Sequence, residues 1–154
     1  MSQCSLETLV MPETLSIKVV IGFDFGMKRI GTAVGQAISL TASPLKTLAA
    51  KDGVPDWHQL SALLLEWQPQ ALVVGVPCHI NGQAQHTTFA AKKFAKKLRH
   101  KFDLPVYEVD ERLTTVEARA MTFDAAGYKG LKKQEMDSVA AALITEQWLS
   151  TMTV

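Results

Sequence analysis

The sequence predicts an α/β protein built on a mixed five-stranded sheet, three antiparallel strands followed by two parallel ones, with helices on both faces. Three observations lead to this fold class. Residues 19–35 contain an apolar run, a short basic turn and a second β-prone run, the pattern of two antiparallel strands. Residues 71–76 are a continuous apolar run between prolines, typical of a strand covered on both faces. Helical patterns alternate with the later strands, which favours a sheet layered between helices.

The first part of the chain is expected to form a meander of three antiparallel strands. The first strand is predicted over residues 16–26 and the second over residues 29–36. A third strand is predicted over residues 45–48, directly after Pro44. Because proline has no N–H group to donate to a neighbouring strand, it is tolerated at the start or the edge of a sheet strand. We therefore expect this third strand at the edge.

A helix is predicted after the meander. Asp56 has the features of an N-cap, with Gln59 in the capping-box position three residues later, and Pro69 limits the helix at its other end. Four large apolar residues fall at helical spacing and define one face: Trp57, Leu60, Leu64 and Trp67. We expect the two tryptophans to belong to the core.

A second helix is predicted to run from Thr87 or Thr88 to about His100, with Phe94 and Leu98 facing inward. Its outer side carries five lysines at helical spacing: Lys92, Lys93, Lys96, Lys97 and Lys101. Such a stripe is either a solvated face or a surface that contacts phosphates, and the sequence leaves both interpretations open.

Carboxylates follow the predicted strands. Asp24 lies near the end of the first strand, a strand over residues 104–109 leads into Asp110 and Glu111, and Asp137 lies in the first turn of a last helix over residues 134–149. Sites in such sheets lie at the C-terminal ends of the parallel strands, so these acids are expected at one edge. A buried, ionised Asp24 would need a cation nearby. Its alternative role is to accept backbone hydrogen bonds in the turn.

The composition limits the possible classes of function. The 154 residues suffice for one domain, expected over residues 16–154 after a poorly ordered extension at residues 1–15. The formal net charge is +1, so any nucleic-acid surface must be a local patch. The two cysteines form no CxxC pair, which argues against zinc. No secretory signal or membrane-spanning run is found, so we expect a cytoplasmic protein without a membrane partner.

Several short motifs follow one another in the order of a known family. They are Asp24-Phe25-Gly26 with Arg29-Ile30-Gly31, Gly75-Val76-Pro77 with Asn81-Gly82, Asp110-Glu111-Arg112-Leu113-Thr114-Thr115, and Met136-Asp137 with Ala140-Ala141. Together they resemble the RNase H-like fold of retroviral-integrase-type nucleases and, within it, the YqgF family, also called RuvX. The likeness extends over nearly the whole chain from about residue 18. Residues 35–37 lack the acidic residue that many members carry there.

The resemblance implies a small bacterial nuclease that depends on a divalent metal and matures the 5′ end of pre-16S rRNA. The acidic positions of the family fall on Asp24, Glu111 and Asp137, which are thereby implied as catalytic residues and metal ligands. Carboxylates suit Mg²⁺ or Mn²⁺, and two such ions can activate a water and stabilise the leaving oxygen. Two alternatives stay open: a Holliday junction resolvase acting on branched DNA, and a nucleic-acid-binding regulator without catalysis. We expect a monomer or a weak homodimer, whereas a resolvase normally needs two sites in a dimer.

Only one of the neighbouring residues Asp110 and Glu111 is expected to be a metal ligand. If the strand continues through both residues, their side chains point to opposite faces, so only one can reach the site. Alternation by itself leaves the choice open, and the family pattern favours Glu111.

Basic residues near the acids are predicted to contact the nucleic-acid backbone. Lys28 and Arg29 follow Asp24 closely, and structural ion pairing is their alternative role. The other predicted contacts are Arg112 and the end of a basic, glycine-containing loop over residues 124–133, namely Lys132 and Lys133.

Overall fold

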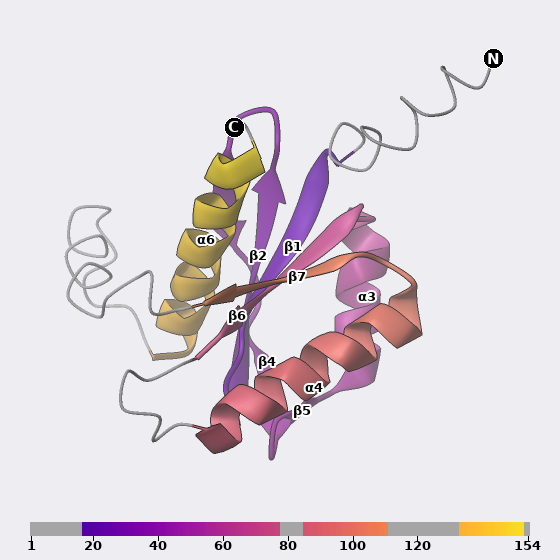
Figure 1. Ribbon diagram of the computed structural model, residues 1–154, viewed down its shortest axis with the longest axis vertical. Coiled ribbons are helices and arrows are strands. Elements are labelled where there is room, and N and C mark those ends of the chain that lie inside the picture. Colours follow the sequence, from indigo (N-terminus) through magenta and orange to yellow (C-terminus); the bar gives the residue numbers. More distant parts are fainter. Residues whose placement is uncertain (1–16, 78–84, 111–132, 153–154) are drawn as a thin grey trace.

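The computed structural model describes residues 17–77, 85–110 and 133–152 (Figure 1). The predicted extension at residues 1–15 lies outside them, as do Glu111, Arg112 and Lys132. In the described part of the chain, no helix is long and apolar enough to cross a membrane.

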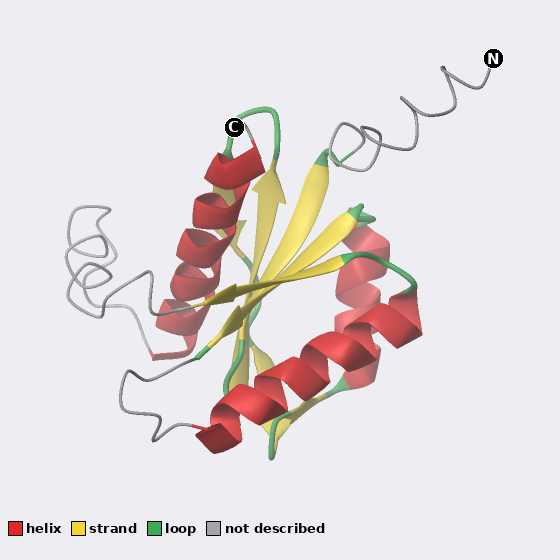
Figure 2. Ribbon diagram, in the orientation of Figure 1, coloured by secondary structure: helices red, strands yellow, loops and turns green. Residues whose placement is uncertain are grey.

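One mixed sheet of seven strands organises the described residues (Figure 2). Its strands are β1 (Val19–Asp24), β2 (Arg29–Gln36), β3 (Thr41–Pro44), β4 (Leu48–Lys51), β5 (Val54–Pro55), β6 (Ala71–Val76) and β7 (Val106–Asp110). Their spatial order is β5-β4-β2-β1-β6-β7, and β3 also pairs with β2. β1 is antiparallel to β2 and parallel to β6, which is parallel to β7. The predicted fold class, with antiparallel strands before parallel ones, is confirmed.

The predicted third strand over residues 45–48 is wrong, because two short strands take its place and raise the strand number above five. β3 pairs with the end of β2, and β4 pairs with its beginning. Between them the chain crosses beside Thr32, whose carbonyl accepts a hydrogen bond from Leu45 N and whose hydroxyl donates to Lys46 O. Pro44 ends β3 because it has no N–H group for the ladder. The sequence pattern did not reveal that the long β2 is paired by two separate segments.

Helices cover both faces of the sheet, as predicted (Figure 1). α3 (Trp57–Trp67) and α4 (Gln85–Phe102) pack on one face, and α6 (Lys133–Met152) packs on the other. Asp56 caps α3, since its carboxylate accepts hydrogen bonds from His58 N at 3.0 Å and Gln59 N at 3.4 Å. The left-handed backbone of Gln68 ends the helix just before Pro69.

Large side chains fill the face under α3 and α4. Phe23 of β1 meets Phe94 of α4 edge to face, with ring centroids 5.5 Å apart. Trp57 stacks on Phe94 at 6.0 Å and Trp67 also packs against this cluster, so the predicted core role of both tryptophans is confirmed. The remaining fully buried members are mainly aliphatic: Ile21, Ile30, Leu48, Leu60, Leu72, Val74 and Leu98.

Glycines of β1 and β2 lie directly under α6. A Cβ atom added to Gly31 of β2 would lie 2.0 Å from the carbonyl oxygen of Asp137. A Cβ atom added to Gly22 of β1 would lie 1.7 Å from the hydroxyl of Thr145. Both distances are far below van der Waals contact, so only glycine allows α6 to approach this closely. The close approach determines how near Asp137 lies to the end of β1.

Candidate active site at one end of the sheet

Asp24 and Asp137 lie on the same face and at the same end of the sheet. Asp24 is the last residue of β1, and it pairs in register with Gly31 of the neighbouring strand. The backbone of Asp137 lies directly over Gly31. Side chains alternate along a strand, and Val20 and Gly22 face α6, so Asp24 faces α6 as well. The fold thus brings together two carboxylates that are more than a hundred residues apart in the sequence.

Arg29 forms an ion pair with Asp137 at this end of the sheet. The distance from Nε to Oδ2 is 2.9 Å, and the side chains of Arg29 and Asp137 are 30% and 27% exposed. Arg29 lies two residues before Gly31 on β2 and therefore shares the face of Asp24. The ion-pairing role that the sequence left open for Arg29 is thus present, and the positive guanidinium offsets part of the charge of the two carboxylates.

Asp110 lies on the opposite face. Glu108, two residues earlier in β7, forms an ion pair with Arg99 of α4 at 3.3 Å. Tyr107, on the alternate position, packs against Trp148 of α6 with ring centroids 4.8 Å apart. Alternation therefore directs Asp110 to the α4 side, away from Asp24. Glu111, the other candidate of the pair, lies outside the described residues.

The end of β7 is nevertheless level with Asp24. Asp24 pairs with Gly75 of β6, and Gly75 pairs with Val109 of β7. The chain thus leaves β7 two strands away from Asp24 and at the same end of the sheet. Within the described ranges, no three His, Cys, Asp or Glu side chains come together as a metal-binding group. The predicted third acid, Glu111, lies outside these ranges.

A buried serine that the sequence analysis missed holds the beginning of α6. Ser138 is 2% exposed, and its hydroxyl accepts a hydrogen bond from Thr32 N at 3.3 Å. The same hydroxyl lies 2.8 Å from that of Thr47. Because Ser138 adjoins Asp137, these bonds fix the backbone that carries the carboxylate. A serine beside an acid in an otherwise alanine-rich helix was the available signal in the sequence.

Lys28 lies in the turn that follows Asp24. Its side chain is exposed, and no carboxylate of the described residues forms an ion pair with it. The turn is fixed against β4 and β5, since Ala50 N donates to Lys28 O at 2.8 Å and Gly53 N donates to Met27 O at 2.9 Å. Lys133 begins α6, and the predicted contacts Arg112 and Lys132 lie outside the described ranges.

Comparison with solved structures identifies the fold. The Thermus thermophilus RuvC in complex with a Holliday junction substrate matches 88% of this chain and 96% of its own, with a TM-score of 0.56 and 15% identity. The fowlpox virus resolvase, in complex with Holliday junction DNA, matches 88% and 99%, with a TM-score of 0.53 and 11% identity. The predicted RNase H-like fold is thereby confirmed.

Comparison of sequences identifies the family. The family model described as "RuvX: Holliday junction resolvase" matches residues 18–151. A relative from Legionella pneumophila is 54% identical over 131 residues, which cover 85% of this chain and 94% of that protein. A relative from Shewanella oneidensis is 46% identical over 134 residues, covering 87% and 95%. Both are named "Putative pre-16S rRNA nuclease". The chain therefore belongs to the RuvX family, also called YqgF, as the motifs predicted.

Proposed function

We propose that this member of a family of resolvase-like nucleases hydrolyses phosphodiester bonds at the 5′ end of pre-16S rRNA, with Mg²⁺ or Mn²⁺ as cofactor. The observation that carries the proposal is the juxtaposition of Asp24 and Asp137 on one face at the end of the sheet. The names of relatives about half identical to this chain supply the substrate.

The donor set suits a hard divalent cation. Asp24 is half-buried and Asp137 is 27% exposed, so both can bind an ion that is also open to solvent and substrate. Carboxylate oxygens are the ligands that Mg²⁺ prefers. We assign Glu111 as the third ligand, because Asp110 belongs to the other face. When bound, the metal ions activate a water and stabilise charge on the leaving oxygen.

The residues of the chain then position the acids and the substrate. The ion pair with Arg29 and the hydrogen bonds of Ser138 hold Asp137 in place. A guanidinium has five N–H donors, so Arg29 can hold Asp137 through Nε and also contact a phosphate. We assign phosphate contacts as well to the exposed residue Lys28 and, from the sequence, to Arg112, Lys132 and Lys133.

Cleavage of Holliday junctions is the second candidate function. It is favoured by the fold, which this chain shares with resolvases solved in complex with junction DNA, and by the description of the family model. A junction presents two strands for cleavage, so this reaction calls for two copies of the site. The oligomeric state in the presence of junction DNA is therefore the discriminating measurement. A monomer or weak dimer that cuts RNA supports the first function.

The experiment offers the purified protein four substrates side by side. They are RNA carrying the 5′ precursor segment of 16S rRNA, a scrambled RNA of equal length, single-stranded DNA and a four-way DNA junction. We expect cleavage of the precursor RNA with Mg²⁺ or Mn²⁺ and none with excess chelator. Preferred cleavage of the junction would replace the first function by the second. Full cleavage in chelator would contradict the metal mechanism, and binding without any cleavage would indicate a regulator.

A further inference from the structure

α4 concentrates positive charge in a chain that is almost neutral. Its 18 residues include five lysines and Arg99, and none is acidic. The formal net charge of the whole chain is only +1, so the remaining residues are acidic on balance. Arg99 pairs with Glu108, and among the described residues no carboxylate forms an ion pair with any of these lysines. A solvated helix commonly mixes charges of both signs, so this composition indicates a polyanionic partner.

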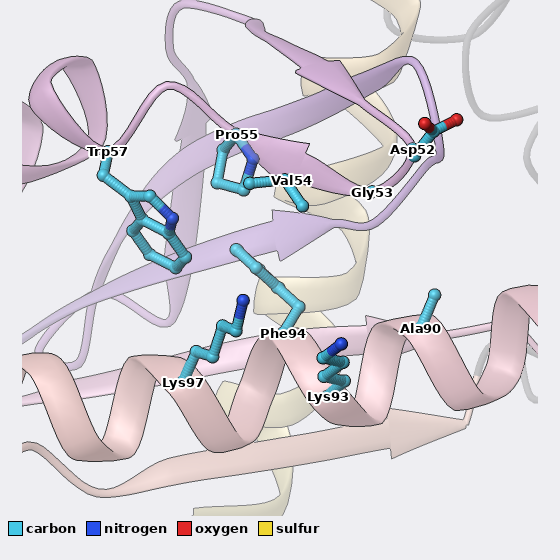
Figure 3. A pocket seen from close by; sticks show the side chains of 9 residues that line it. All are labelled: Asp52, Gly53, Val54, Pro55, Trp57, Ala90, Lys93, Phe94 and Lys97. Atoms are coloured by element: carbon cyan, nitrogen blue, oxygen red, sulfur yellow. The ribbon is translucent and has the colours of Figure 1, made fainter.

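One flank of α4 forms a groove with the β4–β5 turn and with β5. Lys93 and Lys97 line a cavity of about 60 Å³ together with Gly53, Val54 and Trp57. Figure 3 shows both lysines extending from α4 toward β5. The two lysines are one helical turn apart, so their ammonium groups can follow consecutive phosphates of one strand.

One acidic residue, Asp52, borders the groove, but its side chain is turned away from the two lysines. Asp52 lines the cavity, but its carboxylate points away from α4 (Figure 3). Its backbone is left-handed, with φ of 52°, and Gly53 follows with φ of 81°. This tight turn directs the carboxylate outward while the backbone stays against the helix. The two ammonium groups therefore face the groove without an opposing charge from Asp52.

The groove is continuous with the turn that follows Asp24. Gly53 donates its N–H to the carbonyl of Met27, and a Cβ atom added to Gly53 would lie 2.9 Å from the ring of Phe25 and 3.7 Å from the Cβ of Ala90 in α4. The turn 25–28, the β4–β5 turn and α4 are thus in direct contact. A strand held at Asp24 on the α6 face can pass around the end of the sheet at the exposed Lys28 and continue over the β4–β5 turn to Lys93 on the α4 face.

The chemistry of the groove suits phosphates and not bases. Two aromatic residues line the cavity, Trp57 and Phe94, and Phe94 is only 2% exposed. Phe94 stacks on Trp57 with ring centroids 6.0 Å apart, and the Lys101 ammonium lies 4.9 Å from the centroid of the Trp57 ring. The ring therefore offers little surface for a nucleobase to stack on. The groups that remain available to a ligand are ammonium groups, which bind phosphate without reading sequence.

We propose that the flank of α4 formed by Lys93, Lys97 and Lys101, together with the β4–β5 turn, binds the phosphate backbone of the nucleic-acid strand that extends beyond the acidic site. The inference rests on the proposed function for the identity of that site. It assigns to α4 the role that the sequence left open between a solvated face and a phosphate-binding one.

The test is binding of a fluorescent single-stranded RNA of about 20 nucleotides, measured against salt in excess chelator, where no cleavage occurs. We expect the double variant Lys93→Ala/Lys97→Ala to reduce the slope of log K against log salt by about 1.4, since each phosphate contact on a single strand contributes about 0.7. At 0.1 M salt this corresponds to roughly 25-fold weaker binding. Alanine favours helix, so both variants should fold, which circular dichroism verifies.

The matched control is Lys92→Ala/Lys96→Ala, which removes the same charge from the same helix on its other flank. We expect less than half the change in slope. An unchanged slope in the first variant, or equal changes in both, would overturn the assignment of the groove. Because this assay contains no metal, it is independent of catalysis. If the Lys93→Ala/Lys97→Ala variant shows the reduced slope but the wild-type protein never cleaves RNA when metal is added, the nuclease is refuted and the groove is retained.

Discussion

The two faces of the central sheet differ in the size of the side chains that the ends of β1 and β2 place on them. Under α3 and α4, Phe23 meets Phe94, and large side chains fill the space between helix and sheet. Under α6, larger side chains such as Val20 and Val73 pack at other positions, but Gly22 and Gly31 place no side chain beneath the helix, so the backbone of Asp137 lies on the backbone of β2. The difference indicates that one face mainly stabilises the fold and the other mainly positions the site. The first face holds the largest cluster of buried apolar side chains, and the second places a carboxylate beside Asp24.

The different contributions of the two faces to stability have an energetic basis. Burying a large apolar side chain stabilises a fold by about 1.5–3 kcal/mol, so the face with the aromatic cluster contributes strongly to stability. Glycine in a strand gives no such gain and costs backbone entropy. The glycines under α6 are accounted for by the close approach of the helix. Substitutions on the two faces should therefore separate stability from activity.

The largest effect on activity is expected from Asp24→Asn. This change keeps the shape of the side chain and removes one negative charge from a site where carboxylates repel one another. Activity should fall by at least about a hundredfold, while stability without metal stays the same or rises slightly. Thermal unfolding without metal and a nuclease assay with metal, on one preparation, measure both.

The matched control for Asp24→Asn is Asp110→Asn, the same change at the same end of the sheet but on the α4 face. It should retain most of the activity. An Asp24→Asn protein that unfolds with a loss of about 1–3 kcal/mol and still cuts RNA would instead identify Asp24 as a structural acceptor. Equal loss of activity in both variants would remove the distinction between the faces.

The next largest effect is expected on stability, from Phe23→Ala. Removing this fully buried ring leaves a cavity beside Phe94 and should lower the free energy of unfolding by about 3–5 kcal/mol. Because the cavity lies on the face opposite α6, the molecules that remain folded should keep their activity. Urea unfolding gives the loss, and an assay well below the midpoint gives the activity per folded molecule. A fall in that activity as large as for Asp24→Asn would contradict the assignment of separate roles, stability and activity, to the two faces.

A smaller loss of stability, with a clear loss of activity, is expected from Gly31→Ala. The new methyl group meets the backbone of Asp137, so α6 must shift, at a cost of about 1–3 kcal/mol. The shift moves the carboxylate, and activity per folded molecule should fall about tenfold or more, as misplacement by an ångström commonly costs.

Gly35→Ala is the control for Gly31→Ala, on the same strand and the same face. Its methyl group meets the side chains of Thr145, Val20 and Leu149, far from Asp137. We expect a comparable loss of stability with activity retained. If the two variants lose the same activity, the helix moves as a rigid unit and Gly31 has no special role in positioning.

The smallest effect on stability is expected from Arg29→Ala. Both members of the ion pair with Asp137 are more than a quarter exposed, and such pairs contribute about 0–1 kcal/mol. Activity should fall more than stability, because Asp137 loses the group that orients it. Arg29→Lys should restore part of the activity, since it keeps the charge without the fork of donors. A loss above about 2 kcal/mol would assign Arg29 a mainly structural role.

Local patterns in the sequence were sufficient for the elements that depend on local interactions. The strand predicted at residues 29–36 and the one at residues 71–76 match β2 and β6, because apolar patterning reports burial directly. The first helix begins after its cap at Asp56, since that cap is completed within three residues of the chain. The motif pattern singled out Asp24 and Asp137, and the fold places both at one end of the sheet, where the strand order predicted them.

Only the tertiary structure decided the features that depend on distant residues. The split of the third strand follows from how two segments share the length of β2. The ion pair of Arg29 with Asp137 spans 108 residues, and the contact over Gly31 exists only because α6 returns to the sheet. The packing of β7 against α4 and α6 decides on which face of the sheet the Asp110 side chain lies, and alternation alone could not assign that face. In each case the sequence offers the residue types, and the long-range contacts select their partners.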